Sequence, residues 1–475
     1  MATPDFNRDE PLLLHPRATL LPTNFGALLK DPNSGNYHAL SQSWALALAL
    51  CGGTHTFAQI VPAMAQLYGQ PEDRVERELG ELYAEYRRSG VLLTLPRPLP
   101  EPVRDHQPFI FRADENPSAV HPVRLSSLAL QLTDGCPLAC RYCYACVDED
   151  APATGRPMPT STALRVLDQA RAMGVSSIIV GGGEPLIHPD AETILEHIIR
   201  LGFPDIVVST KATTVNGAFA ARLRRTGLRK IQVSLDSWLP DEVDYLLGRT
   251  GVYGRVLRGL FSLLRHGFSV HIRATITRFN ADHFPHLVRS VAPLGVKSFW
   301  AGAVVPVGRG TRDAAPTPEQ LAALEAGLEQ VRREVPGIEL PPVGGTVLNQ
   351  CGGGRLNVFV LADGRVLPCD LITTLATERE VLGSVEEQSL SDIWHGEKTR
   401  AFRKPRVTHP VCLSCRALAL CTGGCRVRAF IATGDMNQPD PLCPKVYPDR
   451  ESGVADAQAH PEPAAPGRPP ESGVC

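Results

Sequence analysis

The sequence has few aromatic residues, no excess of charge and no long hydrophobic run. Of its 475 residues only 6% are aromatic, and 48 Lys and Arg are balanced by 50 Asp and Glu. Such a balance provides no electrostatic surface for nucleic acid or an anionic membrane, so neither partner is expected. The longest uncharged apolar stretch, around Trp44 to Cys51, is too short to cross a bilayer.

The first residues contain neither a basic nor an apolar segment, so we expect no signal peptide and a cytoplasmic protein. The apolar fraction of 43% excludes disorder throughout, and 475 residues are too many for one ordinary core. Thirteen cysteines are present. Because the cytosol keeps thiols reduced, these cysteines indicate metal binding rather than disulfides.

The cysteines are clustered along the chain. Four fall within residues 136–146, seven within residues 351–443, and only Cys51 and Cys475 stand alone. Cys51 is expected to be a small core residue and Cys475 a free thiol. The clustering divides the chain into a cysteine-poor N-terminal part, a middle part and a cysteine-rich C-terminal part.

Residues 11–95 have the pattern of a small α+β unit. Strand-like and helix-like patterns alternate here, with strands expected over 12–14, 27–30, 37–40 and 91–93 and helices over 41–49, 57–68 and 71–88. Residues 41–95 contain four Lys or Arg and six Asp or Glu, a net charge of 4 − 6 = −2 that argues against DNA binding. The proline-rich residues 96–122 predict a linker.

From Leu125 onward the pattern becomes a regular alternation of strand and helix. Six strand-like runs are separated by helical stretches, at 125–132, 177–180, 205–209, 230–235, 269–275 and 296–300. This alternation predicts parallel strands in an open sheet or a partial barrel, with chemistry at the carboxyl ends of the strands. After Pro448 the composition predicts a disordered tail.

The first cysteine group directly follows the first of these strands. Cys136, Cys140 and Cys143 lie within eight residues, so their thiolates can converge on one soft metal centre. Three ligands are one fewer than a closed cluster or a structural zinc site takes, so either Cys146 is the fourth or one position stays open. A zinc knuckle is the alternative that spacing alone allows.

This CxxxCxxC segment, with Tyr142 before its last cysteine, resembles the signature of radical S-adenosylmethionine (SAM) enzymes. The resemblance implies a [4Fe–4S] cluster on Cys136, Cys140 and Cys143, with SAM on the fourth iron and Tyr142 near its adenine. It also implies cleavage of SAM to a 5′-deoxyadenosyl radical that abstracts hydrogen from a substrate, and a reducing donor such as flavodoxin or ferredoxin.

Gly182, Gly183 and Glu184, followed by Pro185, resemble the GGEP motif of the same enzymes and come after the second strand. Glycines let the backbone approach a ligand, and the carboxylate can accept hydrogen bonds from the SAM ammonium group. An ordinary turn uses the same residues, so the motif alone is weak.

Three further segments match the pattern of a SAM pocket. Ser234 and Asp236 resemble the SxD segment of these enzymes, which suggests Ser234 near the SAM ribose. Arg249 resembles an arginine near the SAM carboxylate, with an exposed loop arginine as the alternative. Ser209 ends the third strand and is expected to line the pocket.

The second cysteine group holds seven thiols in 93 residues, which suits two clusters better than one; two zinc sites are the alternative. The pattern resembles the SPASM extension, which carries two auxiliary [4Fe–4S] clusters. The resemblance implies a near cluster on Cys351, Cys369 and Cys425, and a distal cluster on Cys412, Cys415, Cys421 and Cys443. A hairpin is expected around residues 362–365.

The near set departs from SPASM members that have an eighth cysteine, because residues 352–358 contain none. We therefore expect one iron of the near cluster to be open, or to be bound by a non-cysteine ligand or by a substrate thiolate. Asp370 resembles a carboxylate proposed as a base in anaerobic sulfatase-maturing enzymes, and a structural aspartate is its alternative.

The N-terminal unit resembles the PqqD-like recognition element, a winged-helix unit fused to some SPASM enzymes. The likeness rests on its element order and on segments such as residues 37–40 and 89–92. It implies that residues 11–95 bind the leader of a ribosomal precursor peptide as an added strand.

Together these features predict a radical SAM peptide maturase with SAM and three [4Fe–4S] clusters. The expected fold is α/β, a partial (β/α)6 TIM-like barrel with a C-terminal iron–sulfur domain and an N-terminal winged-helix-like domain. The expected domains are 1–95, 96–122 (linker), 123–310 (barrel), 311–447 (SPASM) and 448–475 (tail). The alternatives are a sulfatase-maturase-like Cys/Ser oxidase and a non-enzymatic zinc-dependent peptide-binding scaffold.

Overall fold

The structure, a computed structural model, describes residues 7–23, 26–33, 37–68, 70–101, 103, 125–145, 155–340, 351–403, 407–415, 423–443 and 445–447. Most of the predicted linker lies outside these ranges, as do the predicted tail, Cys146, Cys421 and Cys475. In the described ranges no helix is both long enough and apolar enough to cross a membrane.

The described residues of the N-terminal unit form three helices and two small antiparallel sheets, with strand orders β5-β1-β6 and β2-β3-β4. Its elements are β1 (Pro11–Leu14), β2 (Thr19–Thr23), β3 (Gly26–Lys30), β4 (Tyr37–Ser41), α1 (Gln42–Ala49), β5 (Gly52–Thr56), α2 (Phe57–Tyr68), α3 (Glu72–Arg88) and β6 (Leu92–Thr94).

Two of these strands, β2 and β5, are absent from the sequence prediction. Gly52 and Gly53 do follow the end of α1, but they also open β5, which pairs with β1. Gly53 has φ +89°, a conformation that favours glycine, and a Cβ there would lie 2.6 Å from Leu99. Cys51 is fully buried and donates to the Ala47 carbonyl, so it is the core residue expected.

The middle of the chain alternates strand and helix as predicted. Its elements are β7 (Ser127–Thr133), α4 (Thr160–Ala172), β8 (Ser177–Gly182), α5 (Ala191–Leu201), β9 (Asp205–Thr210), α6 (Gly217–Arg225), β10 (Lys230–Ser234), α7 (Pro240–Leu247), α8 (Tyr253–Arg265), β11 (Ser269–Ile276), α9 (Phe284–Val291), β12 (Ser298–Ala303) and α10 (Pro318–Glu334). The strands β7 to β12 pair in chain order and are all parallel. Because β12 does not return to β7 to close the ring, the sheet is the predicted partial barrel.

The C-terminal part extends the barrel sheet. It contains β13 (Asn357–Val360), β14 (Arg365–Leu367), β15 (Gly383–Ser384), α11 (Leu390–His395), α12 (Glu397–Arg403), α13 (Pro410–Leu413) and α15 (Arg426–Thr433). Strand β13 lies parallel to β7, and β14 and β15 follow it, so one sheet has nine strands. The hairpin predicted around residues 362–365 is the β13–β14 turn.

Packing does not divide the chain at residue 310, where the sequence predicted the end of the barrel. Leu324 and Leu328 of α10 are buried in the barrel core, and so are Val358 of β13 and Trp394 of α11. The barrel and the beginning of the cysteine-rich part therefore share one hydrophobic core.

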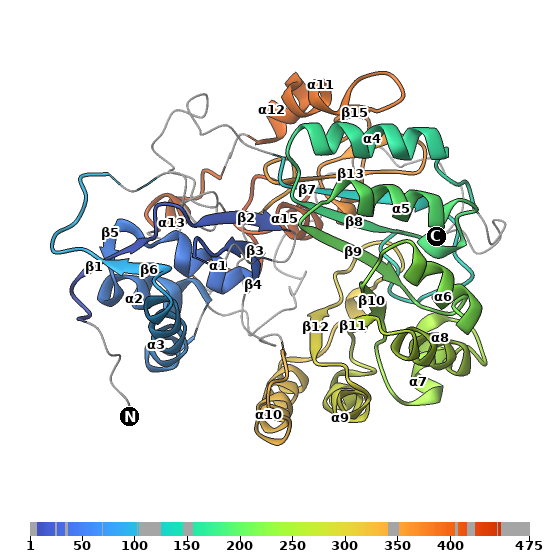
Figure 1. Cartoon of the computed structure of the whole chain (residues 1–475), viewed down its shortest axis with the longest axis horizontal. Helices are drawn as coiled ribbons and strands as arrows, with labels where there is room; N and C mark the ends of the chain where they lie inside the picture. The colour runs from blue at the N-terminus through green and yellow to red at the C-terminus, as the bar shows by residue number, and fades with distance from the viewer. Residues whose placement is uncertain are drawn as a thin grey trace.

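The N-terminal unit packs against the C-terminal end of the chain. Cys443 lies in the core of the N-terminal unit, and Cys415 and Tyr447 pack against that core. The Arg74 guanidinium of α3 donates to Glu325 and Glu329 of α10. Figure 1 shows the blue N-terminal unit toward the left and the green strands and helices of the barrel toward the right, with α13 drawn over the N-terminal unit and α15 between the two.

Candidate functional site

The first cysteine group lies in a loop directly after β7, at the carboxyl end of the barrel strands. The end of α7 holds this loop, because Ala139 and Arg141 donate backbone hydrogen bonds to the carbonyls of Leu247 and Leu246. Gly248 lies so close that a Cβ there would be 2.2 Å from the Ala139 carbonyl oxygen. The loop is thus fixed by backbone contacts.

Of the thiols in this loop, Cys140 is buried, and Cys136 and Cys143 are partly buried. Burial raises the pKa of Cys136, as do negative charges at Glu184, Cys140 and Cys143, and burial raises the pKa of Cys140 to about 11. Free thiols in such a place stay protonated at neutral pH, whereas a bound metal centre supplies the positive charge that favours thiolates. The donor set therefore fits an iron–sulfur cluster, a centre that takes thiolate ligands.

No three His, Cys, Asp or Glu side chains of the described residues are arranged to hold a single metal ion. A four-iron cluster is larger than a single ion, and its thiolates lie farther apart.

A hydrogen-bonded group of three side chains lies beside the cysteine loop. The Lys211 ammonium donates to the Tyr142 hydroxyl at 2.6 Å and to Asp236 Oδ2 at 2.8 Å, and Tyr142 donates to the same carboxylate oxygen. Asp236 Oδ1 accepts from the backbone N–H of Thr275. Burial lowers the pKa of Lys211, but negative charge at Asp236, Cys140 and Cys136 outweighs it, so the pKa is raised and the ammonium stays charged.

Glu184 belongs to the same network but is already occupied by protein donors. It is 1% exposed, and its oxygens accept from Thr210 Oγ1, from the Lys211 backbone N–H and from the Leu186 backbone N–H. Burial raises its pKa, and these hydrogen bonds oppose the rise. In the described structure this carboxylate joins the ends of β8 and β9.

The two glycines before Glu184 let the end of β8 lie close to β7 and to the loop that follows it. A Cβ at Gly183 would lie 1.9 Å from the Gly135 carbonyl oxygen, and one at Gly182, with φ +117°, would lie 2.4 Å from Gln131. The backbone N–H of Glu184 donates to Gly135. Glycine at these two positions therefore lets β8 approach the segment before Cys136, and the expected contact of the two glycines with SAM stays a prediction.

The remaining predicted pocket residues are less tightly grouped. Ser209 accepts a hydrogen bond from Gln232, and Ser234 pairs with Arg273 across β10 and β11. Arg249 is exposed, and its backbone N–H donates to the Asp244 carbonyl. The structure therefore brings together Tyr142 and Asp236, and leaves the side chain of Arg249 at the surface.

The second cysteine group forms two separate sets. Burial raises the pKa of Cys369, and negative charges at Asp370, Cys351 and Cys425 raise it further, which places three thiols in one electrostatic neighbourhood. Burial raises the pKa of Cys412 to about 11, with further contributions from Cys443 and Cys415. These are the described members of the near and distal sets that the sequence predicted.

Tyr144 directly follows the first cysteine loop and interacts electrostatically with residues of the near set. Burial raises the pKa of its phenol, as do the charges of Asp370, Cys143 and Cys369, while Arg273 lowers it. Asp370 Oδ1 accepts a hydrogen bond from the Cys369 thiol at 3.3 Å. The carboxylate proposed as a base thus shares a neighbourhood with both cysteine sets.

Sequence reasoning missed Lys211 and Tyr144. Lys211 directly follows β9, so its place at the carboxyl end of a barrel strand was a usable signal. Tyr144 directly follows Cys143, but its position near Cys369 depends on how β13 and β14 pack against the barrel. Spacing in the sequence carries no such information.

Three family comparisons match successive parts of the chain. Residues 130–291 match the radical SAM superfamily, and residues 351–416 match SPASM, an iron–sulfur cluster-binding domain. Residues 26–92 match coenzyme PQQ synthesis protein D (PqqD).

Similar curated proteins include a PqqA peptide cyclase of Granulibacter bethesdensis, 30% identical over 66% of this chain and 86% of that protein. An AdoMet-dependent heme synthase of Methanosarcina barkeri is 27% identical over 66% of this chain and 95% of that protein. Streptococcus suis SuiB bound to S-adenosylmethionine shares the fold with a TM-score of 0.59, at 18% identity over 91% of this chain and 99% of SuiB. Native anSMEcpe with bound AdoMet shares it with a TM-score of 0.52, at 17% identity over 67% and 94%.

Proposed function

We propose that this chain, which belongs to the radical SAM superfamily and carries an iron–sulfur cluster-binding SPASM domain, modifies a ribosomally made precursor peptide. It is an enzyme that uses S-adenosylmethionine and [4Fe–4S] clusters. When bound, these groups supply a 5′-deoxyadenosyl radical that abstracts hydrogen from the substrate. The product classes open to it are a thioether, a carbon–carbon crosslink or an oxidised side chain.

One observation carries the choice of a peptide substrate: a PqqD-type unit is packed against the cluster-bearing part of the same chain. The core of that unit includes Cys443 and contacts Cys415, so the unit is attached directly beside the distal set. Two relatives agree with this choice, because the PqqA peptide cyclases are named for a peptide and SuiB has been crystallised with the precursor peptide SuiA.

The sheet β2-β3-β4 offers a place for the leader of such a peptide. An extended peptide binds a sheet edge through main-chain hydrogen bonds, and both β2 and β4 are edge strands here. Pro22 in β2 has no N–H to donate, while β4 contains no proline. We therefore place the leader along β4.

We assign the cluster and SAM sites as follows. The radical SAM cluster would be held by Cys136, Cys140 and Cys143, beside the group of Tyr142, Lys211 and Asp236. The near auxiliary cluster takes Cys351, Cys369 and Cys425, and the distal one takes Cys412, Cys415, Cys421 and Cys443. The remaining SAM pocket residues are Gly182, Gly183, Glu184, Ser209, Ser234 and Arg249.

Asp370 is assigned the proton-accepting role. A substrate radical would become a closed-shell product by losing an electron, which an auxiliary cluster would accept, and a proton, which a nearby carboxylate would take. Two observations support this assignment: Asp370 Oδ1 lies 3.3 Å from the Cys369 sulfur, and Asp370, Cys143 and Cys369 all act on the pKa of Tyr144.

The electron donor and the compartment are part of the same proposal. A one-electron donor such as flavodoxin or ferredoxin would supply the reducing equivalent, and nucleic acid has no role. All ten described cysteines are free thiols, which suits the reducing cytoplasm.

The test uses anaerobically reconstituted full-length protein, SAM, a chemical reductant and synthetic peptides that correspond to short reading frames next to its gene. We expect peptide-dependent formation of 5′-deoxyadenosine and a mass change in the peptide. Loss of two hydrogens at a single Cys or Ser would instead identify the sulfatase-maturase-like oxidase. An unmodified peptide with unstimulated SAM cleavage would contradict the proposal.

The leader site is tested from the peptide side, which leaves the enzyme unchanged. In a strand added to a sheet edge, alternate N–H groups face the enzyme. N-methylation of one alternating set should therefore abolish binding, while methylation of the other set leaves it intact. Equal effects of both sets would exclude strand addition.

A further inference from the structure

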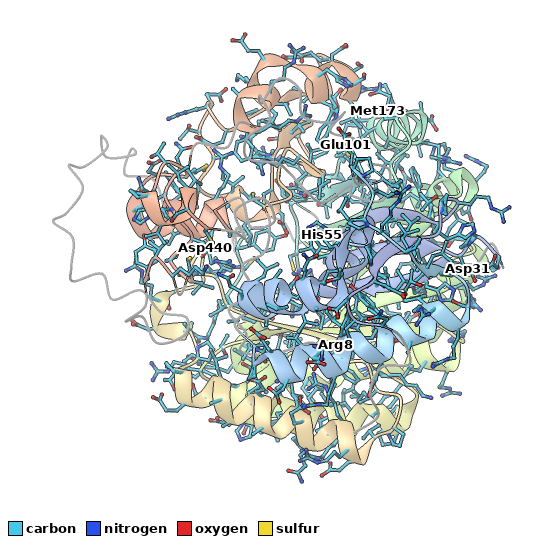
Figure 2. The ribbon with its side chains drawn as sticks, turned by 90° about the vertical axis from the view of Figure 1, so that its left-hand side faces the viewer. Arg8, Asp31, His55, Glu101, Met173 and Asp440 are labelled. Carbon is cyan, nitrogen blue, oxygen red and sulfur yellow. The ribbon has the colours of Figure 1, made fainter. Side chains whose placement is uncertain are left out.

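A buried aspartate connects the two auxiliary cysteine sets. Asp440 is 0% exposed, and its position is labelled in Figure 2. Its carboxylate Oδ2 accepts the backbone N–H of Cys425 at 2.7 Å, and its carbonyl accepts the backbone N–H of Cys443 at 2.9 Å. One residue thus fixes the backbone at a cysteine of the near set and at a cysteine of the distal set.

The partner of this carboxylate is an arginine one turn beyond Cys425 on α15. Arg428 Nε donates to Asp440 Oδ1 at 3.0 Å, and Arg428 Nη2 donates to Oδ2, so the guanidinium binds both oxygens. Such a bidentate pair fixes geometry as well as charge. The Arg428 cation also lowers the pKa of Cys425, although burial raises it overall.

The backbone is built to admit this aspartate. Gly423 and Gly424 have φ +91° and +83°, and a Cβ at Gly424 would lie 2.3 Å from the Asp440 Cβ. The backbone N–H of Asp440 donates to the Gly423 carbonyl at 2.8 Å. The two glycines therefore serve the approach of Asp440 to the near set.

A buried ion pair is in general weak evidence for stability, because well-packed apolar residues of similar volume often serve as well. Charges and hydrogen bonds next to a cluster do, however, set its reduction potential. Reduction adds negative charge, so a nearby cation favours the reduced state and a nearby carboxylate disfavours it.

We propose that the Arg428–Asp440 pair sets the reduction potential of the near auxiliary cluster and fixes its position relative to the distal one. The pair acts through Cys425 and Cys443, so both members are positioning residues. This inference rests on the proposed assignment of the auxiliary clusters.

The experiment is an EPR-monitored redox titration of the full-length reconstituted protein. The near-cluster signal is identified as the one that Cys369→Ala removes. Arg428→Gln should make the midpoint potential of the near cluster more negative, and Asp440→Asn should make it more positive. Arg428→Lys should change this potential least of the three. Arg289→Gln, which breaks an exposed pair with Glu334, is the matched control and should move nothing.

Opposite shifts of this signal, with the radical SAM cluster signal unmoved, are the expected result. The inference would be overturned if Arg428→Gln and Asp440→Asn shift the potential in the same direction, leave it unchanged, or both lose the near-cluster iron. A purely structural role of the pair predicts those outcomes. Absence of any near-cluster signal in the unsubstituted protein would instead contradict the proposed function.

Discussion

Two buried cation–carboxylate pairs stand beside the two cysteine regions, and they differ in design. Lys211 and Asp236, with side chains 14% and 3% exposed, both hydrogen-bond to the Tyr142 hydroxyl at the carboxyl end of the barrel strands. Arg428 and Asp440, 21% and 0% exposed, form a bidentate pair, and the Asp440 carboxylate also accepts the backbone N–H of Cys425 in the near set. The lysine is a point charge that can turn toward a ligand, whereas the arginine is locked into place.

The largest expected effect separates the two cysteine regions. Replacing Cys136, Cys140 and Cys143 together by Ala should abolish SAM cleavage, because the iron that binds SAM is lost. Iron should fall from about twelve to about eight per chain, the count for two remaining cubanes.

The matched variant replaces Cys351, Cys369 and Cys425. It should lose iron but keep SAM cleavage, measured as 5′-deoxyadenosine. Retained cleavage in the first triple variant would refute the assignment of the radical SAM cluster.

A smaller loss of peptide modification is expected when Asp370 is changed. Asp370→Asn should lower peptide product formation by about 10²- to 10⁴-fold, the usual contribution of a general base. SAM cleavage should persist, so the ratio of modified peptide to 5′-deoxyadenosine is the measurement. An unchanged ratio would leave Asp370 a structural residue.

The Lys211–Asp236 and Arg428–Asp440 pairs can be compared by their contribution to the free energy of unfolding. Lys211→Met and Arg428→Met each leave a buried carboxylate without its cation, which costs about 3–5 kcal/mol of unfolding free energy. Arg289→Gln should change the unfolding free energy least of the three, because its pair with Glu334 is exposed to solvent. Urea denaturation of the protein measures all three, and equal losses would remove the distinction between buried and exposed pairs.

The smallest effect concerns pH and the barrel interior. Burial, together with the positive charges of Arg273 and Lys230, lowers the pKa of His271 to about 4. The unfolded chain, with an ordinary histidine pKa near 6.5, therefore binds more protons at acid pH. Stability should then fall by about 2 kcal/mol between pH 7 and pH 5.

His271→Gln should remove this part of the pH dependence. The readout is the urea midpoint at both pH values, compared with His283→Gln, which changes an exposed histidine paired with Glu242. An equal pH dependence in the unsubstituted protein and the His271 variant would contradict the expectation.

The two regions also differ in how far the sequence predicted them. The barrel strands and the loop of Cys136, Cys140 and Cys143 were predicted because their signals are local: alternation of elements and close spacing. The fold class, the family and the cofactors inferred from these signals are confirmed by the topology and the family matches. Tyr142 and Asp236 were singled out by motif, although the lysine that joins them was not.

The auxiliary region depends on contacts between distant segments. The pairing of β13 with β7 and the approach of Asp440 to Cys425 arise only when the chain folds. A motif predicted that Glu184 contacts SAM, which stays a prediction; the motif did not predict the three protein donors that this carboxylate has in the described structure. Local patterns therefore identified the residues of this site better than they identified what each side chain touches.

The most direct test of the three-cluster assignment is the iron and zinc content per chain of anaerobically purified and reconstituted protein. We expect about twelve irons with the visible absorption of [4Fe–4S] clusters and no stoichiometric zinc. Two or three zinc ions per chain in a colourless protein would contradict it.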